Sequence, residues 1–217
     1  HGIGRRQRQM CIRDSGDAAI ELVVETLVQT LERNPRENHR HYLNHFSMRP
    51  PQDTMNKMAE HGIHITQQPN FTYTLEGRYA DNLDGWRLAH NNPLRGPMDA
   101  GIKVALSSDI LPIGPMVGLY AATTRKGMSG EVYGPDEAIT LQEALRGYTL
   151  TSAFINFDEN IKGSLEAGKY ADMIVLPGNL LATPAEELMA VEVQQTYLQG
   201  ELVYQRTAKG AQTQQEP

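Results

Sequence analysis

The sequence is short of several residue types, and each shortage excludes a class of protein. Its 217 residues contain one cysteine, Cys11, so an internal disulfide and a zinc cage built of cysteines are both excluded. No apolar run approaches the roughly 18 residues that cross a bilayer, which argues against membrane insertion. Basic residues are also fewer than acidic ones. Against 26 acidic residues stand 20 lysines and arginines, a net charge of −6, so we do not expect the basic face of a nucleic-acid binder.

What remains is the composition of an ordinary globular chain, 40% hydrophobic and 21% charged. Helical spacing of apolar residues predicts an amphipathic helix over 17–33. Short β-compatible runs predict strands at 41–46, 63–66 and 102–107, with helices at 50–61, 93–100 and 140–151 and another ending at 125. The polar region 70–91 is expected to be an excursion outside the core. Strands that alternate with helices are typical of βαβ units in a parallel sheet.

The two ends of the chain differ from this middle part. Residues 5–16 are basic and glutamine-rich; a natural insertion, an interaction tail or a junction with unrelated sequence would each explain them, and we favour the junction. Residues 160–205 hold short strand candidates at 171–176, 191–198 and 202–204, which predict a separate β element. The polar tail 206–217 is expected to be disordered.

Three polar residues stand at predicted strand ends. His45 ends the first strand, Asp109 follows the third, and His1 precedes a helix, as a strand-end residue would. In an α/β barrel such residues converge at the carboxyl face. Two histidines and one carboxylate from different strands suit a divalent transition metal such as zinc, and the aspartate could also take a proton from water.

The spacing agrees with this interpretation. His45 and Asp109 are 64 residues apart, room for two βα units of about 32 residues. His1 and His45 are 44 residues apart, or 32 when residues 5–16 are left out. A plainer interpretation remains open at this point, because a strand histidine often only packs in the core and an aspartate after a strand often caps a helix.

Several short motifs then resemble amidohydrolase family 3, in family order. They are His1–Gly4 joined to Asp17–Ile20 (His-Ala-Ile-Gly-Asp-x-Ala in the family), His45, Gln68–Pro69, Ser107–Asp109 (Gly-Ser-Asp), and 162–172 (Lys-Gly-Ser-Leu-x-x-Gly-Lys-x-Ala-Asp). The resemblance implies an α/β fold, the C-terminal half of a (β/α)8 TIM-type barrel with part of a small β-sandwich. The implied division is 1–4 as the end of barrel strand 5, 5–16 as foreign sequence, 17–159 as the second half of the barrel, 160–205 as the sandwich segment and 206–217 as the tail.

The resemblance also implies an activity. It predicts hydrolysis of a non-peptide carbon–nitrogen bond in a small molecule by metal-activated water, with His1, His45 and Asp109 as ligands of a divalent metal, zinc first, and Asp109 as general base. The first four barrel strands are absent, so we expect the intact gene product to be active and these 217 residues alone to be inactive. Two alternatives stand: a deaminase of the same superfamily, and an inactive truncated remnant or binding module. We expect a cytoplasmic location; a homo-oligomer is left open.

The chain departs from the family pattern beside the predicted ligands. Asn44 replaces the usual glutamate before His45, and Ser107 replaces the usual glycine, so the hydrogen bonding behind the ligands should differ. The sequence does not identify the substrate-binding residues. Tyr73, Tyr79 and Trp86 would either line a substrate pocket or pack under the 70–91 loop. Arg125 would either face an anionic substrate or be a surface or salt-bridged arginine.

Overall fold

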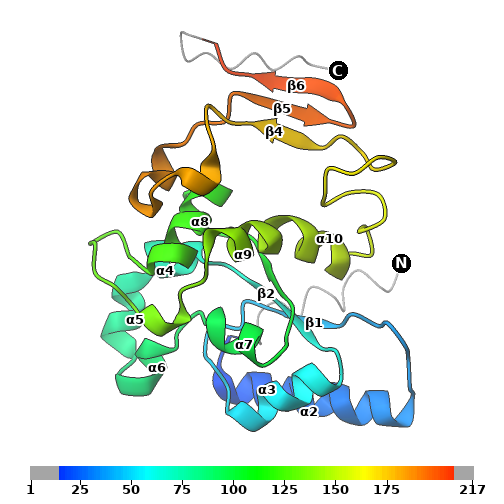
Figure 1. Ribbon diagram of the computed structural model, residues 1–217. Coiled ribbons are helices and arrows are strands. Elements are labelled where there is room, and N and C mark those ends of the chain that lie inside the picture. Colours follow the sequence, from blue (N-terminus) through cyan, green and yellow to red (C-terminus); the bar gives the residue numbers. More distant parts are fainter. Residues whose placement is uncertain (1–14, 208–217) are drawn as a thin grey trace, which may run out of the picture.

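The computed structural model describes residues 15–207, and two separate three-stranded sheets organise that part of the chain (Figure 1). The first sheet is parallel, in the order β1 (Tyr42–Asn44), β2 (His64–Gln67) and β3 (Val104–Leu106). The second is antiparallel, in the order β4 (Met173–Val175), β5 (Gln195–Leu198) and β6 (Glu201–Gln205).

Helices connect and follow the parallel strands. α2 (Asp17–Arg33) precedes β1, and α3 (Gln52–Glu60) links β1 to β2. The connection from β2 to β3 contains α4 (Asn70–Thr74), α5 (Glu76–Asn82), α6 (Gly85–Ala89) and α7 (Arg95–Asp99). After β3 come α8 (Pro115–Thr124), η2 (Pro135–Glu137), α9 (Leu141–Arg146), η3 (Gly147–Thr151) and α10 (Ser152–Ile155). Between β4 and β5 lie η4 (Leu180–Ala182) and η5 (Ala185–Ala190).

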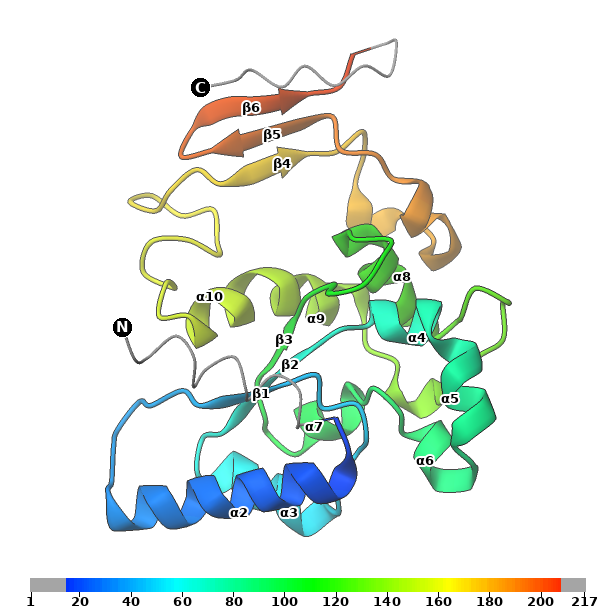
Figure 2. The same cartoon turned by 180° about the vertical axis from the view of Figure 1, so that it is seen from behind.

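The parallel sheet lies between two helical layers. In Figures 1 and 2, α2 and α3 run along one side of the strands and α9 and α10 along the other. The strands accordingly carry buried apolar side chains such as Leu43, Ile65 and Val104, as strands covered by helices do. This packing holds the carboxyl ends of β1, β2 and β3 at one edge.

Local sequence signals explain most element ends. The predicted helix 17–33 is α2, and its buried residues Ile20, Val24 and Val28 repeat every four positions. α3 ends before Gly62, whose φ of +63° is the left-handed conformation that favours glycine. Thr140 and Glu143 form the predicted capping box at the start of α9.

Two regions have more structure than the sequence predicts. Region 70–91, expected as an excursion outside the core, contains three short helices, α4 to α6, of only five to seven residues each, too short to show a helical period. The helix predicted over 140–151 is α-helical only to Arg146 and continues as the π-helical η3. Gly147 begins η3 against β3, where a Cβ would lie 2.7 Å from Leu106 Cγ, so glycine allows the close approach.

Within residues 160–205, β4, β5 and β6 form a sheet of their own. Their sheet lies at the far end of the molecule in both views, beyond α8 and η5 (Figures 1 and 2). Among the described residues, none of the helices has the length and apolar character needed to cross a membrane.

Candidate active site

His45 and Asp109 meet at the carboxyl edge of the parallel sheet. His45 directly follows β1, and its backbone N–H donates to Thr66 O at 3.0 Å, which fixes it beside β2. Asp109 stands three residues after β3. His45 Nδ1 and Asp109 Oδ2 are 3.7 Å apart, with side-chain exposures of 17% and 52%. The structure therefore brings two of the three predicted site residues together.

Both residues have an unusual backbone. His45 has a φ of +75° and Asp109 a φ of +59°, in the left-handed region that side chains other than glycine rarely enter. Strained backbone of this kind occurs at functional sites, but it is not confined to this pair, because Arg40, Phe46 and Arg125 also have a positive φ.

The side chain of Gln68, which is 1% exposed, lies behind His45. Its Oε1 is 2.8 Å from His45 Nδ1. Its Nε2 donates to Asn44 Oδ1 at 3.1 Å and to Ser107 Oγ at 3.0 Å. The two residues that depart from the family pattern are therefore both partners of this one buried amide.

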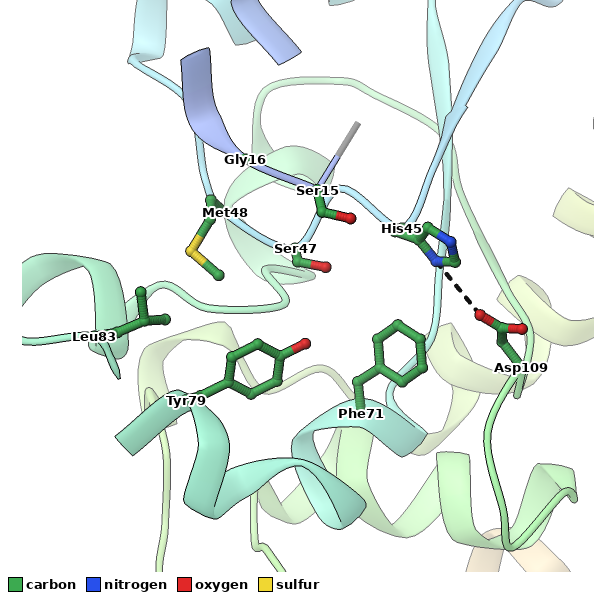
Figure 3. A pocket seen from close by; sticks show the side chains of 9 residues that line it. All are labelled: Ser15, Gly16, His45, Ser47, Met48, Phe71, Tyr79, Leu83 and Asp109. Carbon is green, nitrogen blue, oxygen red and sulfur yellow. Dashed lines mark ion pairs between the residues drawn. The ribbon is translucent and has the colours of Figure 1, made fainter. Parts of the chain in front are cut away.

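A pocket of about 570 Å³ opens over the pair (Figure 3). Its lining comes from the start of α2, the segment after β1, α4, α5 and the segment after β3: Ser15, Gly16, His45, Ser47, Met48, Phe71, Tyr79, Leu83 and Asp109. The ring of Phe71 is 5.6 Å from that of His45, centroid to centroid. Burial raises the pKa of Tyr79, and hydrogen bonds with Asn92 and Ser47 partly offset that rise.

The other residues that the sequence suggested for the pocket lie in different places. Tyr79 lines the pocket, whereas Tyr73 packs edge-on against Tyr120 and Trp86 stacks on His90. Arg125 is neither at the pocket nor on the surface.

Arg125 is fully buried and bonded to backbone carbonyls, and this corrects the expectation of a surface, salt-bridged or substrate-facing residue. Its guanidinium donates to Tyr133 O at 2.9 Å, to Asn92 O at 2.9 Å and to Asn91 O at 2.7 Å. It joins the end of α8 to the segment before α7, a structural role that no local motif announces.

The third predicted ligand, His1, lies outside the described residues, as do residues 1–4 and most of the 5–16 segment. Within 15–207, no group of three or more histidine, cysteine, aspartate or glutamate residues is arranged to hold a metal ion. His45 and Asp109 thus offer two side chains that could bind a metal ion. Sequence reasoning missed Ser47, Met48, Phe71 and Leu83, because a pocket wall has no spacing rule.

The fold and the site together define an α/β protein with polar side chains gathered at the carboxyl edge of parallel strands, where enzymes of this architecture place their catalytic groups. The comparison with protein families then identifies the group: residues 4–204 match the Amidohydrolase family, and the chain belongs to it.

Relatives support this assignment. The N-substituted formamide deformylase of Arthrobacter pascens is 34% identical over 159 residues, covering 70% of this chain and 28% of the relative. The putative amidohydrolase YtcJ of Bacillus subtilis (strain 168) is 26% identical over 208 residues, covering 94% and 39%. The chain thus spans between about a quarter and two fifths of the length of these relatives.

A solved structure shares the fold. An uncharacterized metal-dependent hydrolase from Pyrococcus horikoshii OT3 superposes with a TM-score of 0.65 at 21% sequence identity, covering 79% of this chain and 34% of that one. At this identity the likeness shows the fold alone.

Proposed function

We propose that the gene product containing this chain hydrolyses a non-peptide carbon–nitrogen bond, of the amide or N-acyl type, with the help of a divalent metal, zinc first. The observation that carries the proposal is that the His45 ring and the Asp109 carboxylate come within 3.7 Å of each other at the strand ends, inside a pocket. The 34% identical relative, an N-substituted formamide deformylase, supports the bond type.

The donor atoms fit such a metal in kind. Imidazole nitrogen and carboxylate oxygen are the ligands of hydrolytic zinc sites. His45 and Asp109 would supply two of them, and we propose His1 as a third. When bound, the metal supplies Lewis acidity, which polarises a carbonyl group and lowers the pKa of water.

We assign the proton transfers to Asp109, whose side chain is half-exposed in the pocket and accessible to water. Its carboxylate would accept a proton as the water oxygen bonds to the acyl carbon. The same carboxyl would then give that proton to the substrate nitrogen as the carbon–nitrogen bond breaks, so the products are an acid and an amine.

The apolar part of the pocket wall indicates the kind of substrate. Met48, Phe71, Tyr79 and Leu83 present apolar and aromatic surface (Figure 3). Apolar walls with a few convergent polar groups are typical of small-molecule sites. We infer that a hydrophobic substituent of the amide packs here, with the scissile bond toward His45 and Asp109.

We also propose that β1, β2 and β3 with their helices belong to the second half of a (β/α)8 barrel, and that residues 160–205 are its β-sandwich segment. Their parallel order and the shared edge that carries the site support this. We expect the 217 residues by themselves to show no turnover, because they cover only 28% and 39% of the two relatives described above.

The test uses the gene product that contains this chain, loaded with zinc. Formate release from N-benzylformamide is compared with ammonia release from nucleobases. We expect the first reaction, and we expect Asp109→Asn to lower its kcat/KM by roughly 10² to 10⁴-fold, the usual contribution of a general acid–base.

Asp81→Asn is the matched control, because this exposed carboxylate lies on α5 outside the pocket lining. Equal activity of the two variants would refute the role of Asp109. Ammonia release alone would establish the deaminase alternative. Turnover by the 217-residue chain would refute its proposed inactivity.

A further inference from the structure

The amide of Gln68 connects the carboxyl ends of all three parallel strands. Gln68 directly follows β2. Its side chain contacts His45, which follows β1, and Ser107, which follows β3. Gln68 is 1% exposed, so these contacts replace water that a surface amide would use.

The surroundings fix which way the amide points. Gln68 Nε2 lies 3.4 Å from Thr66 O, a backbone carbonyl that can only accept, and also faces Asn44 Oδ1 and Ser107 Oγ. Turning the amide over would set its oxygen against that carbonyl. The Oε1 atom must therefore be the one that faces His45.

An amide oxygen has no proton to give, so His45 Nδ1 must donate in the 2.8 Å contact. In a neutral imidazole only one nitrogen carries hydrogen, so Nε2 then holds the lone pair. Asp109 Oδ2 is 3.7 Å from the same Nδ1, beyond hydrogen-bond distance, and does not compete in this geometry.

We propose that Gln68 is a positioning residue that holds His45 in the Nδ1–H tautomer and thereby makes Nε2 the free donor for a divalent cation. The cation rests on the proposed function; the tautomer does not. Asn44 and Ser107, the departures from the family pattern, take part by accepting from Gln68 Nε2 and keeping its oxygen turned toward His45.

The first experiment reads the tautomer directly, without metal. The 217-residue chain is labelled with ¹⁵N-histidine and studied by NMR about two pH units above the ordinary imidazole pKa of roughly 6.5. His45→Gln identifies the His45 signals. We expect a protonated Nδ1 and an unprotonated Nε2, and the opposite pattern in the unaltered chain would overturn the proposal.

Gln68→Met removes the acceptor while keeping the length of the side chain. It should lower the ratio of the Nδ1–H to the Nε2–H form by roughly two- to tenfold, the range of one net hydrogen bond. Gln67→Met is the matched control. Gln67 is the fully buried last residue of β2; its amide donates to Phe46 O and accepts from the Gln68 backbone N–H at 2.9 Å, and it does not contact the His45 ring. Circular dichroism establishes that both variants fold.

A tautomer ratio unchanged by Gln68→Met, or changed equally by Gln67→Met, would refute the positioning role. A zinc competition titration separates the two proposals. Gln68→Met should weaken zinc binding about 10 to 100-fold, as loss of a ligand's supporting hydrogen bond does, and Gln67→Met should not. If the chain binds no zinc at all, the metal site fails, while the NMR result still decides the role of Gln68.

Discussion

At the residue scale, His64 is a histidine that lies away from the candidate active site. It starts β2, at the edge of the sheet opposite to His45, and its ring packs edge-on against Phe154 at 5.6 Å. Its Nδ1 is buried and has no hydrogen-bond partner in the part of the chain that the structure describes. Burial lowers the pKa of His64 to about 4, and the positive charges of Lys103, His39 and Arg40 act in the same direction.

This lowered pKa predicts a pH-dependent stability. Between about pH 6.5 and 4 the unfolded chain binds a proton at His64 that the folded chain does not, so the free energy of unfolding should fall as the pH falls through that window. The loss is at most about 3 kcal/mol. Urea unfolding at several pH values measures it.

The variant His64→Leu should flatten this part of the pH profile. The variant should still lose stability at lower pH. The hydrogen bond from Arg95 lowers the pKa of Glu143 to about 2, and the stability that this interaction gives is lost only as the pH falls from about 4.5 toward 2. Identical slopes for both proteins above pH 4.5 would show that His64 is not the titrating group.

At the element scale, α8 depends on one small residue. A Cβ at Gly118 would lie 1.8 Å from the Tyr148 hydroxyl and 2.8 Å from Asn70 Oδ1. α8 and α4 pack side by side here, so the helix cannot move away freely. Gly118 is therefore required by packing and not by backbone conformation.

We predict that Gly118→Ala lowers the free energy of unfolding by about 1–3 kcal/mol through overpacking. Adding Tyr148→Phe, which removes the obstructing hydroxyl, should recover part of this loss. Gly77→Ala on α5, where no heavy atom lies within 4 Å, should instead raise stability by up to about 1 kcal/mol. Thermal unfolding compares the variants, and equal effects of the two alanines would contradict the packing argument.

Elements were predictable where their patterns are long. The 17 residues of α2 show a clear period, and the capping box marks the start of α9. The helices α4 to α6 carry no such signal, and the π-helical η3 depends on the contact of Gly147 with Leu106, which is a tertiary effect. For the site, strand ends suggested His45 and Asp109, but the choice between a site and plain packing depended on the resemblance to a family. The bonds of Gln68 cross three strands, and no single stretch of sequence contains them.

At the scale of the whole molecule, residues 160–207 are held to the rest chiefly through η5, which packs on α8. Leu188 on η5 is fully buried, and Lys126 pairs with Glu186 at 2.7 Å beside it. Leu188 is therefore a fully buried apolar anchor of this attachment, and Leu180 and Ala185 pack against the same core beside it.

We predict that Leu188→Ala costs about 2–5 kcal/mol, as truncation of a buried leucine does, and raises hydrogen exchange throughout β4, β5 and β6. Leu181→Ala, at a side chain that is 59% exposed on η4, should change stability by no more than about 0.5 kcal/mol. Unchanged exchange in the antiparallel sheet of the Leu188 variant would show that other contacts hold it.

The left-handed backbone at Asp109 has a consequence for how this protein can change. Glycine adopts a φ of +59° without strain, so Asp109→Gly should leave the free energy of unfolding unchanged or raise it by up to about 1 kcal/mol, measured in urea, while amide hydrolysis is lost. A clear destabilisation would show that the carboxylate supports the fold.

The folding quality control of a cell would then accept the Asp109→Gly protein as readily as the active protein. Only selection for catalytic activity could then keep Asp109 in a population. A lineage without that selection would lose the activity long before it lost the fold.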